Sequence, residues 1–180
     1  MHKRLLIAAG LIGLALSVNG VTYKDIDIFG TQGVQLKNQP LTDIFNISNS
    51  DGEGGDVVGF NPVTEMVSSA TAYFSLKNNQ SGEVDTYSID LSDEAFLSGI
   101  VTEKTPITVF GNLNVTLLAE LNTLGQIEYT VQEESGASLK LMWAELDAVA
   151  GPKPVPDGSM TVALLALALA GLGSLGRRKT

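Results

Sequence analysis

The residues with the clearest potential for chemistry form one acidic, glycine-rich stretch, Asp51-Gly52-Glu53-Gly54-Gly55-Asp56. Its three carboxylates stand on a flexible backbone, and Ca²⁺ takes about six to eight oxygen ligands in proteins. The ordered spacing of an EF-hand is missing, and glycine occupies positions where ligands would be expected. Acids and glycines also build ordinary solvated turns. The stretch is therefore either a calcium site formed by Asp51, Glu53 and Asp56 or a plain acidic loop, and the loop interpretation is the simpler one.

A second acidic group, Asp90, Asp93 and Glu94, offers a less favourable set of the same ligands. Pairs of carboxylates also perform glycoside hydrolysis. With 20 acidic residues in the chain, some pair will always exist, and no sequence feature selects one. We therefore predict a protein that is not an enzyme and that needs no cofactor other than an optional Ca²⁺.

Histidine and cysteine chemistry is absent from the body of the chain. The only histidine is His2, near the start, and there is no cysteine. Ser-His-Asp and Cys-His catalysis, zinc sites built on histidine and thiolate ligands are thereby excluded. The absence of cysteine also excludes a disulfide framework, so packing alone must stabilise the fold.

Aromatic side chains provide the other candidate chemistry, because exposed rings stack on sugar faces while nearby polar groups fix the orientation. Tyr73 lies on the polar side of a predicted strand and is the best candidate for carbohydrate binding. Trp143 shares a predicted apolar face with Leu139 and Leu141. We therefore expect Trp143 in the core and not in a binding site.

The charge distribution argues against nucleic acid as a partner. Five of the 11 basic residues lie at the two ends of the chain, whereas all 20 acids lie between Asp25 and Asp157. Without the ends, 6 basic residues face 20 acids, a net charge of −14, and no arginine remains. Such a domain is repelled by phosphate backbones.

The elements that must position these residues begin after an N-terminal export signal. Residues 1–20 combine a basic start, Lys3-Arg4, with a short apolar run and small or polar residues. This pattern is typical of a secretory signal peptide, with cleavage after Ser17 or after Gly20. The alternative is an uncleaved anchor, for which the run is short, since about 20 apolar residues are usual.

Residues 21–150 predict an all-β domain. Apolar and polar residues alternate with period two over short runs, and turn-forming residues recur between them, as in an antiparallel β-sandwich of the jelly-roll kind. The clearest strand runs from Met66 to Leu76, with Ala70, Ala72, Phe74 and Leu76 on one face. The other candidate strands are 25–28, 41–47, 84–91, 96–101, 107–118, 126–131 and 138–146.

Three local expectations follow from the same patterns. Alternation over residues 25–28 places Asp25 and Asp27 on the solvent side of their strand. The strands 66–76 and 84–91, joined by a loop rich in Asn and Gly, predict a β-hairpin. The run 116–122 is compatible with a helical turn, but its neighbours favour a strand.

The sequence of the C-terminal region predicts a linker followed by a membrane segment. Residues 151–156 are rich in proline and predict a stiff, extended spacer. Residues 159–176 carry no charge and as a helix would span roughly 27 Å, close to the ~30 Å of a hydrocarbon core. The basic residues Arg177, Arg178 and Lys179 would stay inside, so the acidic body would be outside.

A permanent membrane anchor would explain that apolar run and its basic stop. It would not explain the motif Val155-Pro156-Asp157-Gly158-Ser159 directly before the run. Motif, apolar segment and basic end together resemble the PEP-CTERM class of bacterial sorting signals, specifically its VPDSG-CTERM variant. Gly158-Ser159 stands where Ser-Gly or Gly-Gly is more usual. The resemblance covers residues 155–180.

The resemblance implies an exosortase-type membrane peptidase as partner and cleavage near the motif. It also implies transient anchoring in the inner membrane, followed by transfer to the envelope, the surface or the extracellular matrix. We therefore expect an exported, sorted β-sandwich with a structural or interaction role. The alternative is a small carbohydrate-binding module, with optional stabilisation by calcium, whose partner is an extracellular polysaccharide.

Overall fold

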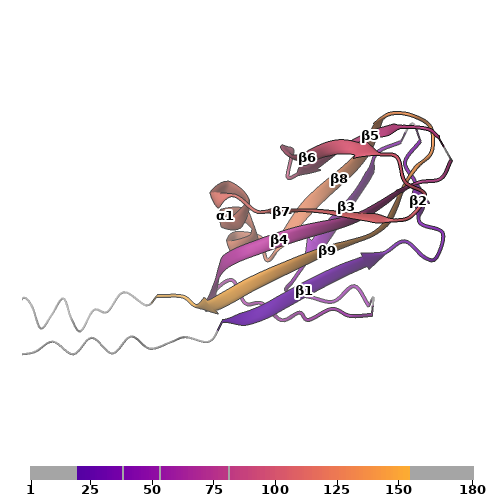
Figure 1. Cartoon of the computed structure of the whole chain (residues 1–180). Helices are drawn as coiled ribbons and strands as arrows, with labels where there is room; N and C mark the ends of the chain where they lie inside the picture. The colour runs from indigo at the N-terminus through magenta and orange to yellow at the C-terminus, as the bar shows by residue number, and fades with distance from the viewer. Residues whose placement is uncertain (1–19, 38, 53, 81, 155–180) are drawn as a thin grey trace, which may run out of the picture.

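The computed structural model of the chain describes residues 20–37, 39–52, 54–80 and 82–154. Within these ranges the chain forms nine strands and one helix, arranged as two antiparallel sheets (Figure 1). The prediction of an antiparallel β-sandwich is confirmed. The elements are β1 (Val21–Ile28), β2 (Val34–Gln35), β3 (Leu41–Asn46), β4 (Glu65–Asn78), β5 (Asp85–Leu91), β6 (Glu94–Val101), β7 (Ile107–Asn112), α1 (Val115–Leu124), β8 (Gln126–Ser135) and β9 (Leu139–Pro152).

The strands of the two sheets pair in a nested order along the chain. The β9 sheet has the order β1-β9-β4-β7, with β2 also paired to β9, and the β8 sheet has the order β3-β8-β5-β6. The first long strand thus pairs with the last, β3 with β8, β4 with β7 and β5 with β6. This nesting gives a jelly-roll-like order, in which β5 and β6 form the innermost pair.

Aromatic rings from both sheets fill the centre of the sandwich. The ring centroid of Phe45 lies 4.4 Å from that of Tyr129 and 6.0 Å from that of Phe74. All three side chains are fully buried. Burying a side chain of this size contributes about 1.5–3 kcal/mol. In the absence of disulfides, contacts of this kind hold the sheets together.

The predicted hairpin of 66–76 with 84–91 is wrong. β4 pairs with β7 and β9, whereas β5 pairs with β6 and β8 in the other sheet. The turn-forming residues between β4 and β5 therefore carry the chain from one sheet to the other. Alternation was read correctly in both strands, because the inward sides of both are buried.

The expected strand at 107–118 is also wrong in its second half, because residues 115–124 form α1. The side chain of Asn114 accepts hydrogen bonds from the backbone N–H groups of Thr116 and Leu117, at 2.9 and 3.0 Å. Gly125 ends the helix with φ = 71°, the left-handed conformation that glycine adopts without strain. Leu117 and Leu121, one helical turn apart, are buried against the sandwich.

The face of β1 is inverted relative to the prediction. Asp25 and Asp27 point into the sandwich and are only 2% and 4% exposed, whereas Ile28 is exposed. The interior supplies hydrogen bonds to both carboxylates: Asn46 N–H donates to Asp25 Oδ2 at 2.6 Å and the Tyr129 hydroxyl to Asp27 Oδ2 at 2.7 Å. The expectation that both aspartates face solvent is wrong.

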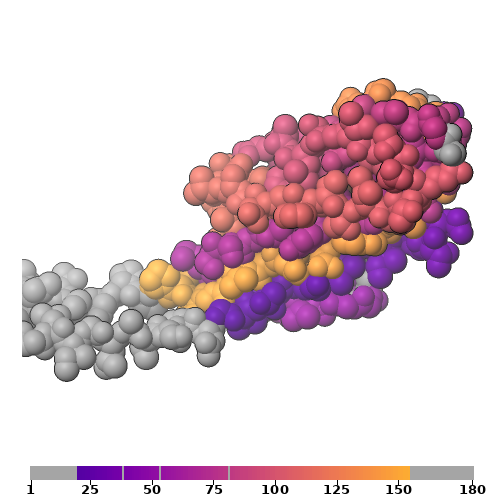
Figure 2. Space-filling view, viewed as in Figure 1, coloured from indigo at the N-terminus to yellow at the C-terminus, as the bar shows by residue number. Residues whose placement is uncertain are grey.

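The two ends of the described domain are neighbours. Val21, at the start of β1, pairs with Ala150, near the end of β9. Figure 2 shows the indigo start of β1 beside the yellow end of β9. β9 itself runs to Pro152, beyond residue 146, where the predicted strand ends. Among the described residues no helix is long and apolar enough to cross a membrane. The predicted signal peptide and the predicted tail lie outside the described ranges.

Candidate functional site

The outer face of the β9 sheet gathers side chains from four strands in transverse rows. One row contains Ile26, Glu145, Tyr73 and Phe110, since β9 pairs with β1 on one side and with β4 on the other, and β7 continues the row. In each of these strands the next residue points into the core. The row therefore joins a carboxylate and two aromatic rings on a single surface.

Tyr73 and Phe110 form the aromatic centre of this face. They are directly paired across β4 and β7, and their ring centroids lie 5.7 Å apart with an angle of 33° between the planes. Phe110 is 63% exposed. Phe110 was not predicted as a site residue, although its position in an alternating strand could have indicated it. Tyr73 is on the outer face, as expected, and is half-buried.

Trp143 lies on the same face, so its predicted place in the core is wrong. The register of β4 and β9 shifts between Ser75 and Leu76, which leaves Met142 as an extra residue on β9. Leu139 and Leu141 stay fully buried. After the bulge, Trp143 lies opposite Ser75, half-buried, and shares its face with Glu145. A one-residue bulge inverts the alternation that the sequence suggested.

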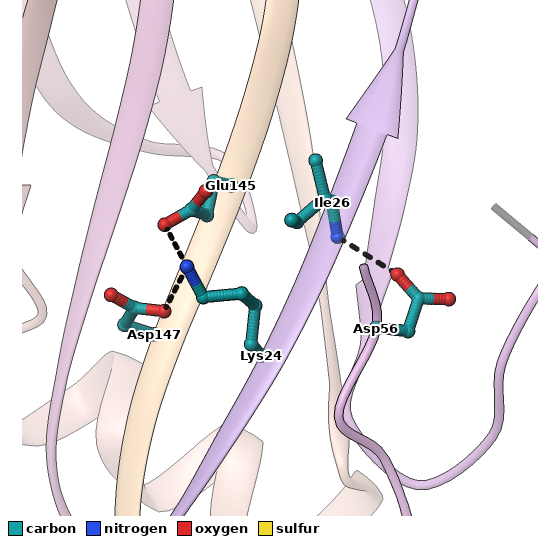
Figure 3. A network of polar contacts seen from close by, with 5 residues as sticks. All are labelled: Lys24, Ile26, Asp56, Glu145 and Asp147. Carbon is teal, nitrogen blue, oxygen red and sulfur yellow. Dashed lines mark hydrogen bonds and ion pairs between the residues drawn. The ribbon is translucent and has the colours of Figure 1, made fainter. Parts of the chain in front are cut away.

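Polar groups surround the rings of Tyr73 and Phe110, and most of them lie on the neighbouring row of side chains. Lys24 Nζ lies 2.7 Å from Glu145 Oε1 and 3.4 Å from Asp147 Oδ1 (Figure 3). The hydrogen bond from Lys24 to Glu145 raises the pKa of the lysine, although partial burial works against it. Thr71 Oγ1 donates to Asn112 Oδ1 at 2.8 Å, on the side of β4 away from β9. Carboxylate, ammonium, hydroxyl and amide groups thus stand around the aromatic pair.

The glycine-rich stretch lies beside the free edge of β1. Val57 pairs with Lys24 through two backbone hydrogen bonds of 2.8 and 2.9 Å. The Asp56 carboxylate accepts from the backbone N–H of Ile26 at 3.2 Å (Figure 3) and from the Ser50 hydroxyl at 2.8 Å. Asp56 therefore helps to attach this segment to β1.

Calcium binding by this stretch stays a prediction, because Glu53 lies outside the described residues. Asp51 is exposed. Within the described ranges, no three His, Cys, Asp or Glu side chains are arranged to hold a metal ion.

The residues of the second acidic group, Asp90, Asp93 and Glu94, have different roles in the structure. Ser92 and Asp93 form the turn between β5 and β6, with φ of 47° and 63°. Glu94 accepts from the Asn114 side chain at 3.0 Å, next to the start of α1. Asp90 lines a shallow pocket of about 280 Å³ together with Phe96.

Sequence reasoning missed a buried polar cluster at the β8–β9 turn. Asp85 and Ser138 are fully buried, and the Ser138 hydroxyl lies 3.0 Å from Asp85 Oδ2 and 2.7 Å from Asn78 Oδ1. Glu133 Oε1 accepts from Ser138 N–H at 3.0 Å. Burial raises the pKa of Glu133, and the nearby Asp85 raises it further. The cluster fixes the turn between β8 and β9.

The sorting-signal residues predicted in the tail cannot be compared with the fold. They lie outside the described residues and are Val155, Pro156, Asp157, Gly158, Ser159, Arg177, Arg178 and Lys179.

Comparison with known proteins gives distant resemblances in fold. No family model and no curated protein matches the chain. Among solved structures, latent PorU from Porphyromonas gingivalis aligns with a TM-score of 0.43 and 10% identity, over 76% of this chain and 14% of that one. Tobacco streak virus coat protein aligns at 0.40 and 15%, over 81% and 96%. The C-terminal CBM6 domain of the laminarinase LamC from Zobellia galactanivorans aligns at 0.35 and 13%, over 70% and 98%. At these scores none of them indicates a function.

Proposed function

We propose that this domain binds an extracellular polysaccharide on the outer face of the β9 sheet. The observation that carries the proposal is the pair of half-buried Tyr73 and exposed Phe110 on the outer face, with ring centroids 5.7 Å apart. Aromatic rings in water offer apolar faces on which sugar rings stack, and the tyrosine hydroxyl adds a polar handle. The exposed ring of Phe110 leaves apolar area in water that a ligand would cover.

The polar surroundings suit a hydroxylated ligand better than an apolar one. Glu145 and Asp147 accept hydrogen bonds, Lys24 donates them, and Asn112 can do both. Lys24, Asp147 and Asn112 lie on the row next to the rings, and Glu145 lies on the same row as the rings. A small number of oriented polar groups around aromatic rings gives both affinity and orientation. The role proposed here is binding, without catalysis.

Export and sorting form the second part of the proposal, supported by the sequence motifs. A signal peptide over residues 1–20 and a tail with Val155-Pro156-Asp157 would place the domain outside the cell, in contact with polysaccharide. The adjacency of Val21 and Ala150 means that both segments would join the domain at the same end. The exosortase-type peptidase and the inner-membrane intermediate belong to this proposal.

Retention of the purified 21–154 domain on a panel of immobilised polysaccharides tests the binding proposal. Each aromatic contact contributes about 0.5–1.5 kcal/mol, so Tyr73→Ala and Phe110→Ala should each weaken binding roughly twofold to tenfold. Ile100→Ala is the matched control, because Ile100 is 61% exposed but lies on β6, in the opposite sheet. Circular dichroism verifies that each variant is folded.

The outcomes separate clearly. Loss of retention in both aromatic variants, with unchanged retention in Ile100→Ala, supports the face defined here. If the parent domain is retained on no polysaccharide of the panel, carbohydrate binding is rejected. If all three variants behave like the parent, the β9 sheet is not the binding face.

A further inference from the structure

Asp25 is a carboxylate in the interior of the sandwich that the binding face does not use. It is 2% exposed. Its Oδ2 atom accepts the 2.6 Å hydrogen bond from Asn46 N–H. Its Oδ1 atom is buried and has no hydrogen-bond partner among the described residues. A buried carboxylate oxygen without a partner strongly disfavours the charged form of the group.

The charged groups around Asp25 are negative on each element that faces it. Asp27 follows on the same inward side of β1, and Asp51 and Asp56 approach from the segment after β3. On β8, the Tyr129 hydroxyl donates to Asp27, and burial raises the pKa of this tyrosine, with a further rise from the nearby carboxylates. Tyr23 lies two residues before Asp25 on the same inward side of β1, and its hydroxyl donates to Glu65 of β4 at 2.8 Å.

The nearest lysine in sequence cannot compensate. Lys24 points to the outer face of the β9 sheet, where Glu145 and Asp147 hold its ammonium group. Binding of a proton would remove the charge of the Asp25 carboxylate.

We infer that Asp25 binds a proton in the native state and that loss of this proton destabilises the sandwich, because it leaves a buried charge on a carboxyl group whose Oδ1 atom has no partner among the described residues. The hydrogen bond from Asn46 N–H to Oδ2, which joins β1 in one sheet to the end of β3 in the other, offsets only part of this cost. The site makes the stability of the domain depend on pH between the ordinary pKa of an aspartate and neutrality.

The direction of the pH effect follows from proton linkage. Burial raises the pKa of Asp25 from 3.8 to about 7, the Asn46 N–H works against this, and Asp27, Asp56 and Asp51 raise it further. Between these two values the folded protein holds a proton that the unfolded chain has released. Stability is therefore greatest at acidic pH and falls as pH rises, by up to about tenfold in the unfolding equilibrium constant per pH unit. Above the folded pKa the dependence ends.

Urea unfolding of the 21–154 domain across this pH window, with a chelator present, tests the inference. The wild type should lose stability as pH rises, whereas Asp25→Asn, which imitates the neutral carboxyl, should show a flatter profile. Asp43→Asn is the control, since Asp43 is an exposed carboxylate on β3, and it should keep the wild-type slope. The carboxyl carbon of Asp25, followed by NMR, should titrate far above 3.8.

Two results would overturn the inference. One is an Asp25 carboxyl that titrates at or below its ordinary value in the folded protein, which decides the matter even if Asp25→Asn does not fold. The other is a wild-type profile that becomes flat on addition of Ca²⁺ alone, because a cation would then occupy the place assigned to the proton.

Discussion

Tyr73 and Phe110 stand directly opposite each other on β4 and β7, with ring centroids 5.7 Å apart on the outer face of the β9 sheet. β7 is the edge strand of this sheet, so the pair reaches the border of the face. Trp143 and Glu145, two residues apart on β9, extend the same surface toward β1. The face thus has aromatic and polar groups from three adjacent strands.

The single tryptophan makes this face directly observable. Trp143 is the only tryptophan of the chain and is half-buried on the face that holds Tyr73. We predict that a bound polysaccharide changes the tryptophan emission of the wild-type domain in a saturable way. Fluorescence titration with soluble oligosaccharides measures this change in emission. In Phe110→Ala the change should persist but require a higher ligand concentration. If a ligand binds the wild-type domain and leaves the tryptophan emission unaffected, the binding site lies elsewhere.

Removal of the Tyr129 hydroxyl should destabilise the fold. That hydroxyl donates to Asp27 Oδ2 at 2.7 Å, and both groups are buried. Because a buried acceptor loses its donor, Tyr129→Phe should lower the free energy of unfolding by about 1–3 kcal/mol. Urea denaturation gives the value. Tyr87→Phe is the control, since Tyr87 is similarly buried but its hydroxyl lies above Gly99. An equal cost in both variants would argue against a special role of the Asp27 bond.

Asn122 attaches α1 to an irregular part of β4. Its side chain accepts from Val67 N–H at 2.6 Å and donates to the carbonyls of Val67 and Leu118, at 3.0 and 2.8 Å. The register of β4 with β9 shifts just after Val67. The Asn122 amide therefore hydrogen-bonds the backbone N–H and carbonyl of Val67 at a point where the ladder is irregular. Asn122→Ala should cost about 1–3 kcal/mol.

Thermal denaturation of Asn122→Ala and Thr123→Ala provides the comparison. Thr123 Oγ1 donates to the Ala119 carbonyl within the helix at 2.8 Å, and Thr123 is exposed. Its substitution should stay within about 0.5 kcal/mol of the wild type. A loss in Thr123→Ala as large as that in Asn122→Ala would contradict the bridging role.

Processing at both ends is the expected consequence of the two terminal signals that we propose. The intact mass of the protein recovered from the envelope or the medium should lack the predicted signal peptide and the segment after the Val155-Pro156-Asp157 motif. A variant with Pro156→Ala and Asp157→Ala should remain in the membrane fraction with its tail. Recovery of a full-length C terminus from the mature wild-type pool would reject the sorting proposal.

The alternation of the sequence identified the strands but not their partners. Ala72, Phe74 and Leu76 were correctly placed inside, because period two fixes which residues share a face. Whether β4 pairs with β5 or with β9 depends on contacts between distant segments, which a local pattern does not encode. The expected hairpin failed for this reason.

The prediction for β1 was wrong because it was based on side-chain polarity alone. Polarity suggested that Asp25 and Asp27 face water, but Asn46 and Tyr129, which are distant in sequence, donate hydrogen bonds to them in the interior. Trp143 was misplaced because one extra residue, Met142, inverts the alternation, and no local signal marks that bulge. The helix was also predicted wrongly, because the neighbouring strand patterns were given more weight than its own signals. Asn114 before it, Leu117 and Leu121 one turn apart and Gly125 after it are the signals of an N-cap, a buried stripe and a C-cap.

If the proposed tail tethers the domain, β9 would determine how the domain responds to mechanical force. This strand pairs along its length with β4 on one side and with β1 and β2 on the other, and Pro152 is its last residue. A pull on Pro152 against a ligand bound at Tyr73 would run parallel to the strands, whereas the hydrogen bonds of an antiparallel ladder lie across them. The ladder would then be loaded in shear, so that many bonds resist at once, whereas an unzipping geometry breaks them one by one. Under the proposed function, a tether at this position would let the domain hold a strained polymer without being unravelled from its end.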